Sequence, residues 1–145
     1  MGISALAFIA GFIISGLDFR FGWSKVPMPV VIVASAVLLV SYGLYAEVMR
    51  ENAYLSRVIK VYEGQKVVDT GLYAVVRHPM YMATVFLFLA IPLVLGSWYA
   101  FVIFLLYPAA LVVRIINEEK VLSAELEGYE EYKKKVKYRM FPFIW

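Results

Sequence analysis

The 145-residue sequence contains no cysteine and only one histidine. Without thiols the protein forms no disulfide bond and has neither a cysteine nucleophile nor a cysteine metal ligand. A histidine metal centre needs two or more imidazoles, which a single residue does not provide. We therefore expect no metal site, and any reaction must depend on other side chains.

The glycine pattern of phosphate-binding loops is also missing. Gly64 and Gly71 do not have G-x-G-x-x-G spacing, and no strand-turn-helix pattern surrounds them. This excludes a soluble Rossmann domain. A nucleotide-like cofactor would therefore have to bind between membrane helices and a cytoplasmic loop.

Apolar residues, in contrast, make up 63% of the chain, and the mean hydropathy is +0.76. Soluble domains are about half apolar, so we predict an all-α integral membrane protein. Four apolar runs come close to the roughly 20 residues that a helix needs to cross a bilayer: residues 3–17, 29–48, 79–95 and 97–116. Because the turn at Gly96 is very short, the third and fourth runs are predicted to form an antiparallel helical hairpin.

The net charge of +3 does not indicate a nucleic-acid partner, because the basic residues gather in segments next to the apolar runs. They lie within residues 49–78 and again at residues 133–139, where they are interpreted as flanks that face the cytoplasm and anionic membrane lipids. Both termini are therefore predicted to be cytoplasmic. The first run has no basic n-region and no clear cleavage site, so we interpret it as a retained span of a multi-pass protein.

Two polar segments are large enough to carry a site in what we treat as a single membrane domain, residues 1–145. Residues 49–78 form a cytoplasmic loop, and a loop of this length is usually functional. Residues 117–145 are predicted to begin with an amphipathic charged helix to Val136, weakened at Gly128, and to end in an aromatic tail. Residues at helical spacing are expected to pack this helix onto the core or the membrane surface: Leu122, Leu126, Tyr129, Tyr132 and Val136. Within the third and fourth runs, prolines at 92 and 108 are expected to kink the helices.

The most informative segment is Arg77-His78-Pro79, at the start of the third run. The proline keeps His78 out of the helical conformation and itself begins a helix. The free N–H groups and the positive dipole end of that helix attract anions, and Arg77 adds a fixed charge. An equally good interpretation is that these residues mark a membrane edge, with Tyr73 and Tyr81 in the aromatic belt.

Arg114 and Glu118 form a second candidate pair, because residues four apart share one face of a helix. Arginine before glutamate is the weaker order for helix stabilisation. A charge within an apolar run costs about 2.5 to 3.5 kcal/mol on insertion scales, which favours a functional pair over a snorkelling arginine. Glu119 points to a different face, where a solvated position is the simplest interpretation.

Together these blocks resemble the isoprenylcysteine carboxyl methyltransferase family and its phospholipid methyltransferase relatives. The resemblance covers about residues 18–145. It rests on three ordered blocks: Gly71-x-Tyr73-x-x-x-Arg77-His78-Pro79-x-Tyr81, then Arg114-x-x-x-Glu118-Glu119, then Tyr129-x-x-Tyr132-x-x-x-Val136 with Arg139 and Pro142. The Arg-His-Pro block alone is less specific, since membrane sterol and lipid reductases carry a similar one.

The resemblance implies a membrane methyltransferase that uses S-adenosylmethionine and releases S-adenosylhomocysteine. The acceptor would be lipophilic: the carboxylate of an isoprenylcysteine-like or other lipid-like molecule. By family analogy the catalytic residues would be Arg114, which faces the acceptor, and Glu118. The cofactor site would consist of Gln65, Lys66, Val67, Val68, Tyr73, His78, Pro79, Met80, Tyr81 and Glu118.

The chain departs from the family pattern at Gln65, where a histidine is common, and at Ala83, where a glycine is common. It also has fewer spans than eukaryotic members, which suggests a protein of a prokaryotic cytoplasmic membrane, so the family name does not fix the acceptor. An NADPH-dependent membrane reductase of the sterol type is the nearest rival, although such enzymes tend to have asparagine at the Met80 position. A non-enzymatic membrane scaffold is the third hypothesis, and the insertion cost of Arg114 argues against it.

Overall fold

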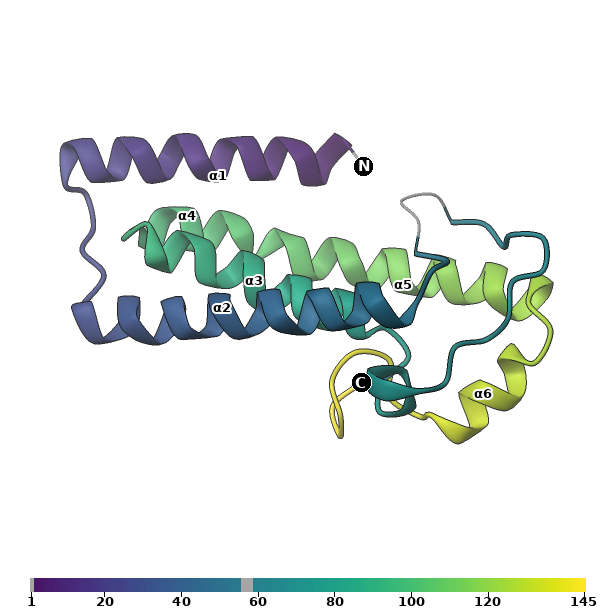
Figure 1. Ribbon diagram of the computed structural model, residues 1–145. Helices are drawn as coiled ribbons and strands as arrows, with labels where there is room; N and C mark the ends of the chain where they lie inside the picture. Colours follow the sequence, from purple (N-terminus) through teal and green to yellow (C-terminus); the bar gives the residue numbers. More distant parts are fainter. Residues whose placement is uncertain (1, 56–58) are drawn as a thin grey trace. The chain divides into compact units, whose positions relative to one another are not determined.

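The computed structural model describes residues 2–55 and 59–145 (Figure 1). Over this part the chain is helical and contains no strand, which confirms the predicted all-helical fold class. The elements in chain order are α1 (Gly2–Phe21), α2 (Met28–Glu51), the 3-10 helix η1 (Gly71–Ala74), α3 (Pro79–Val94), α4 (Trp98–Phe104), α5 (Leu106–Glu125) and α6 (Tyr129–Lys135).

Two stretches of the described chain are long and apolar enough to cross a membrane. Met28–Glu51 has 24 residues and a mean hydropathy of 2.0, and Trp98–Glu125 has 28 residues and a mean hydropathy of 2.2. Only 11% and 22% of these apolar stretches are buried. Core helices of a soluble protein would be mostly buried, so this exposed apolar surface is typical of helices that lipid surrounds.

The chain folds as two compact units, and the division falls inside helices α2, α3 and α5. Unit 1 consists of Met1–Gly43 and Ala83–Leu111, and unit 2 of Leu44–Met82 and Val112–Trp145. Within unit 1, α1 packs against α4. A Cβ atom at Gly11 would lie only 2.2 Å from the Phe104 ring, so the absence of a side chain permits this close approach.

The kink predicted near Pro108 falls at Leu105, which interrupts the helical stretch for one residue and keeps right-handed helical angles, φ −63° and ψ −17°. α4 ends at Phe104 and α5 begins at Leu106. Pro108 explains the position, because a proline ring clashes with the carbonyl group four residues earlier, here that of Phe104. Pro92, in contrast, lies inside the continuous helix α3.

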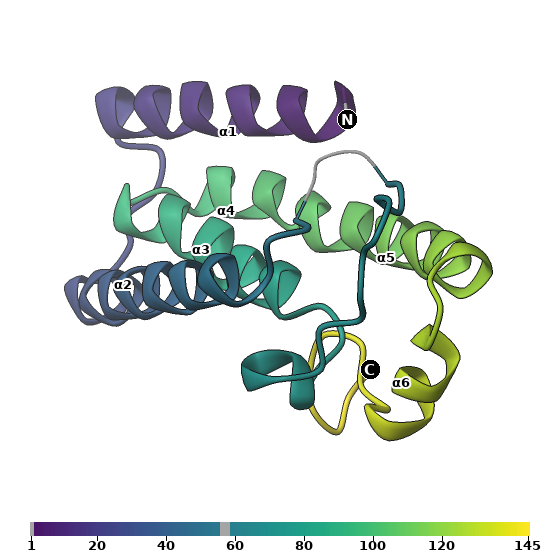
Figure 2. The same ribbon diagram turned by 45° about the vertical axis from the view of Figure 1, so that its right-hand side comes forward.

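The charged C-terminal helix is also divided, at Gly128. α5 ends at Glu125 and α6 begins at Tyr129, where the prediction had one helix to Val136 (Figure 2). Gly128 has φ 83°, in the left-handed region that favours glycine, so it ends a helix and does not merely weaken one. The predicted packing across this turn is confirmed by a buried cluster of Leu126, Tyr129, Tyr132 and Val136, with Leu122 packed against it.

Candidate functional site

A pocket in unit 2 gathers nine of the ten predicted cofactor residues. They are Gln65, Lys66, Val67, Val68, Tyr73, His78, Met80, Tyr81 and Glu118. The tenth, Pro79, is fully buried at the first position of α3. The enclosed volume is about 90 Å³, well below the roughly 300 to 1,000 Å³ of typical ligand sites. A cofactor-sized molecule would therefore also fill space that opens to solvent.

Sequence reasoning missed several other residues that line this pocket. Arg77, which the sequence had singled out for its charge, also lines it, and the missed residues are Asn52, Tyr54, Leu55, Ile59, Lys60, Leu122, Leu126, Tyr129 and Tyr132. The last four were predicted from their helical spacing as packing residues, which they also are. Spacing alone does not tell a packing face from the wall of a pocket.

The segment before α3 is held in place by the C-terminal tail. α3 begins at Pro79, and His78 stands at the helix entrance as predicted. The backbone N–H groups of Arg77 and His78 donate hydrogen bonds to the carbonyl groups of Tyr138 and Arg139, at 2.9 and 2.7 Å. Residues about 60 positions apart in the sequence are thus joined through their backbones beside the pocket.

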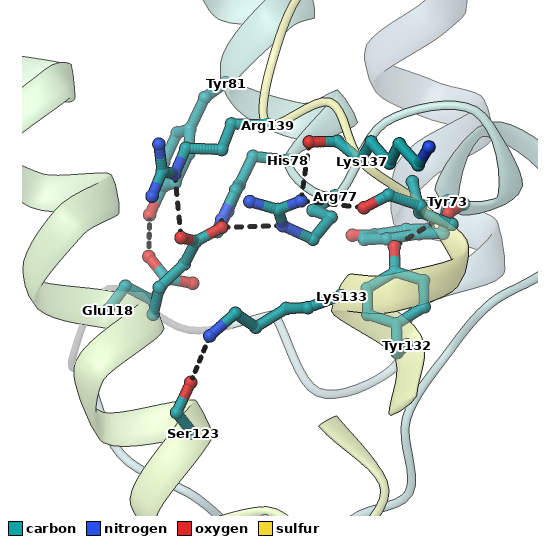
Figure 3. Close-up of polar contacts among 12 residues, drawn as sticks. Tyr73, Arg77, His78, Tyr81, Glu118, Ser123, Tyr132, Lys133, Lys137 and Arg139 are labelled. Carbon is teal, nitrogen blue, oxygen red and sulfur yellow. Dashed lines mark hydrogen bonds and ion pairs between the residues drawn. The ribbon is translucent and has the colours of Figure 1, made fainter. Parts of the chain in front are cut away.

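Glu119 accepts hydrogen bonds from three side chains in a buried ion-pair cluster (Figure 3). Its Oε1 accepts from Arg77 Nε at 2.7 Å, and its Oε2 accepts from Arg139 Nε at 2.8 Å. His78 Nε2 lies 3.3 Å from Oε1. Glu119 is only 5% exposed, so its interpretation as a solvated residue is wrong. Burying a carboxylate costs free energy unless the group is paired with a charge and hydrogen-bonded. Here two guanidinium groups provide both the opposite charge and the hydrogen bonds.

Arg77 also has buried partners, contrary to the expectation that its charge attracts an anion at the helix entrance. Its Nη1 donates to the carbonyl groups of Val136 and Lys137, at 2.7 and 2.9 Å, in addition to its pairing with Glu119. The side chains of Arg77 and His78 are 6% and 5% exposed. Both side chains are therefore buried within unit 2, whichever side of the membrane edge the block occupies.

Tyr81 joins the two residues predicted to be catalytic. Arg114 Nε donates to the Tyr81 hydroxyl group at 2.7 Å, and that hydroxyl group donates to Glu118 Oε2 at 2.6 Å. The Arg114 guanidinium also lies 5.7 Å from the centre of the Tyr81 ring. Arg114 and Glu118 thus lie on one face of α5 as predicted, and Arg114 is connected to the pocket through Tyr81.

Tyr73 is fixed from two sides at the pocket. Asn52 Nδ2 donates to the Tyr73 hydroxyl group at 2.9 Å, and the Tyr132 hydroxyl group donates to the Tyr73 carbonyl at 2.7 Å. Burial raises the pKa of Tyr73 to about 12 and also raises the pKa of Tyr132. Both phenols therefore stay neutral at physiological pH, and Tyr73, 6% exposed, is not an aromatic-belt residue.

The hydroxyl group of Tyr129 has no hydrogen-bond partner within the described chain, although the residue is only 4% exposed. Burial raises its pKa, so this phenol is also neutral. A buried polar group without a partner costs about 1 to 3 kcal/mol. The Tyr129 residue lines the pocket, while its hydroxyl oxygen is itself buried from solvent.

The sequence model of phospholipid methyltransferases matches residues 29–127, more than half of the chain. The protein belongs to the phospholipid methyltransferase family. Family membership implies a methyltransferase that works in the membrane, in agreement with the two exposed apolar stretches. The match covers all of the predicted cofactor and catalytic residues and ends before α6. No curated protein matches the sequence.

Proposed function

We propose that this phospholipid methyltransferase family member uses S-adenosylmethionine to methylate a lipophilic acceptor. The observation that carries the proposal is the pocket of unit 2, which collects residues predicted as cofactor contacts from the loop before η1, the start of α3 and α5. Members of the family generally use this cofactor.

The residues around the pocket fit the chemical groups of S-adenosylmethionine. Glu118 offers a carboxylate to a cationic group, and the faces of Tyr73 and Tyr81 are favourable for cations. Leu122 suits one face of a flat base. When bound, the cofactor supplies a methyl group on a positively charged sulfur.

The task of the protein is then to align the acceptor and exclude water, because methyl transfer needs orientation more than a covalent nucleophile. We assign acceptor binding to Arg114, whose planar guanidinium group suits a carboxylate and whose Nε donates to the Tyr81 hydroxyl group beside the pocket. A carboxylate acceptor has no proton to lose. An amine acceptor would have to give a proton to Glu118 or to His78, both of which line the pocket.

The proposed membrane arrangement has four spans, residues 3–17, 29–48, 79–95 and 97–116, with the last two as a hairpin. The basic residues of the loop 49–78 and of the C-terminal segment support a cytoplasmic position for both. The pocket would then face the cytoplasm, where S-adenosylmethionine is made, and both termini would lie on the same side. The small number of spans supports a prokaryotic host.

Calorimetry on the detergent-purified protein tests the proposed function. We expect S-adenosylhomocysteine to bind and NADP not to bind. Binding of NADP alone would support the reductase hypothesis, and binding of neither would support the scaffold. Glu118→Gln should reduce the affinity for S-adenosylhomocysteine, whereas Tyr138→Phe, a control outside the pocket lining, should not.

The acceptor is tested separately by following transfer of a labelled methyl group from S-adenosylmethionine. Detergent-solubilised lipids that end in a carboxylate should be methylated faster than matched lipids that end in an amine. Faster methylation of the amine series would overturn the assignment of Arg114 to an acceptor carboxylate and would make Glu118 or His78 the proton acceptor.

A further inference from the structure

We propose that Glu119, held by Arg77 and Arg139, sets the tautomer of His78, so that His78 Nδ1 accepts a hydrogen bond from a hydroxyl group of the bound nucleoside cofactor. In this assignment His78 contacts the ligand, whereas Glu119 and Arg139 are positioning residues. The inference rests on the proposed function, because it is the cofactor that supplies the hydroxyl group.

The tautomer follows from the hydrogen bonds of Glu119. An ionised carboxylate only accepts hydrogen bonds, and Glu119 is kept ionised by two arginines whose Nε atoms lie 2.7 and 2.8 Å from its oxygens. His78 Nε2 must therefore carry the proton in its 3.3 Å contact with Glu119 Oε1. A carboxylate that orients an imidazole in this way leaves the other ring nitrogen as an acceptor.

His78 Nδ1 makes no hydrogen bond within the part of the chain that the structure describes, while the residue lines the pocket. Atom Nδ1 is not one of the fully buried polar atoms without a partner, so it is accessible to a molecule in the pocket. The ring is held by stacking on Tyr81, with the ring centres 5.6 Å apart and the planes 21° apart. His78 Nδ1 is therefore a fixed acceptor on a pocket residue.

The charges around His78 favour a neutral hydroxyl donor over an ammonium group. Arg77 and Arg139 contribute two positive charges against the one negative charge of Glu119, so the cluster carries a net charge of +1. A second positive charge in a buried place is unfavourable, which disfavours a ligand cation at Nδ1. The carboxylate of Glu118, which binds Tyr81, is the better partner for the cationic groups of the ligand. This leaves the ribose hydroxyl groups for His78.

The chain has a single histidine, so nitrogen NMR of protein labelled with ¹⁵N-histidine reports on His78 alone. In the ligand-free protein we expect a proton on Nε2 and none on Nδ1. Adenosine at saturation should shift the Nδ1 resonance, and 2′,3′-dideoxyadenosine at saturation should leave it in place. A proton on Nδ1 in the ligand-free protein would overturn the proposal. An equal shift with both nucleosides would also overturn it.

Variants test whether Glu119 and Arg139 position the His78 ring or only stabilise the fold. Glu119→Gln replaces an obligate acceptor with an amide that can donate, so Nδ1 should gain a proton and the affinity for adenosine should fall about tenfold. Arg139→Ala should broaden the ¹⁵N resonances of His78 that report its tautomer, and Arg139→Lys should make them sharp again. Arg50→Ala, which removes an exposed ion pair with Glu47, is the matched control and should change neither. A Glu119→Gln protein with unchanged spectrum and affinity would refute the role of Glu119.

The two proposals fail in different ways. If neither adenosine nor S-adenosylhomocysteine binds, both the proposed function and the proposed contact of His78 Nδ1 with a ligand hydroxyl group are wrong. The tautomer of the ligand-free protein still decides whether Glu119 orients His78, and that measurement does not need a variant that folds.

Discussion

Glu118 and Glu119 are adjacent in the sequence and have entirely different surroundings. Successive residues of an α-helix point about 100° apart, so one carboxylate meets Tyr81 at the pocket while the other meets Arg77 and Arg139. Glu118 is thus placed to contact a ligand. Glu119 ties the start of α3 to the C-terminal tail.

Glu118→Gln should weaken S-adenosylhomocysteine binding by about 10- to 100-fold, because hydrogen bonds to charged groups contribute about 1.5 to 3 kcal/mol. Calorimetry measures this change. Arg114→Ala should leave that affinity within a few fold and instead lower the turnover of the acceptor, measured as initial rates of methyl transfer. Arg114→Lys keeps the charge without the planar fork and should recover part of the rate. Unimpaired turnover in both Glu118→Gln and Arg114→Ala would contradict the assigned roles.

Tyr129→Phe should leave the free energy of unfolding of the ligand-free protein unchanged or raise it by up to about 1 kcal/mol, because it removes a buried hydroxyl group without a described partner. Tyr132→Phe is the matched control. It removes the 2.7 Å hydrogen bond to the Tyr73 carbonyl and should lower the free energy of unfolding by about 1 kcal/mol. Denaturant titration in detergent measures both changes. An equal loss in the two variants would mean that the Tyr129 hydroxyl group has a partner of its own.

The family resemblance predicted which residues gather at the pocket but not how Glu119 is used. Tyr73, His78, Pro79, Tyr81 and Glu118 stand in the sequence blocks that carry the resemblance, whereas Gln65 to Val68 and Met80 were assigned by analogy with the family alone. The partners of Glu119 lie 42 positions before it and 20 positions after it. Such a cluster depends on tertiary contacts, which spacing along one helix does not encode.

At the scale of helices, the apolar runs predict where helices form. Pro108 and Gly128 lie next to the places where these helices are interrupted. Pro108 and Gly128 were both recognised as weak points in the sequence. Pro92 lies within the continuous helix α3, whereas the helix that contains Pro108 is interrupted at Leu105. For Gly128 the decisive property is its φ of 83°, which is a feature of the fold and not of the residue type.

Gly128→Ala should therefore destabilise the turn between α5 and α6. The left-handed conformation costs an L-residue roughly 1 to 2 kcal/mol, and the only atom near a new Cβ is Val67 Cγ2 at 3.9 Å, so the loss reflects the backbone and not a clash. Gly16→Ala is the control, because Gly16 lies within α1 and has nothing within 4 Å of a new Cβ. Alanine there should stabilise the helix by about 0.5 to 1 kcal/mol. Thermal unfolding in detergent should move in opposite directions for the two variants, and a shift in the same direction would contradict this explanation.

At the scale of the whole molecule, the apolar surface and the charged segments divide the chain between lipid and water. Large exposed apolar side chains occur along α1, α2 and α5, such as Leu6, Leu39 and Val113, with exposures of 69%, 72% and 61%. The Glu119 cluster and the polar pocket lie in unit 2. The proposed cofactor is water-soluble and the proposed acceptor is lipophilic, so the proposed function needs access from both water and lipid.

The cysteine-free chain offers a clean background for testing how it crosses the membrane. Lys25, Glu63 and Lys134 have exposed side chains and lie in the segments predicted outside, in the loop and after the last span. In intact cells, a membrane-impermeant maleimide should label Lys25→Cys and should label Glu63→Cys and Lys134→Cys only after permeabilisation. This pattern follows from the basic residues that flank the loop and the C-terminal segment on the cytoplasmic side. Labelling of Lys25→Cys and Glu63→Cys from the same side would mean that Met28–Glu51 does not cross the bilayer. Labelling of Glu63→Cys and Lys134→Cys in intact cells, without labelling of Lys25→Cys, would mean that the orientation is the opposite of the predicted one.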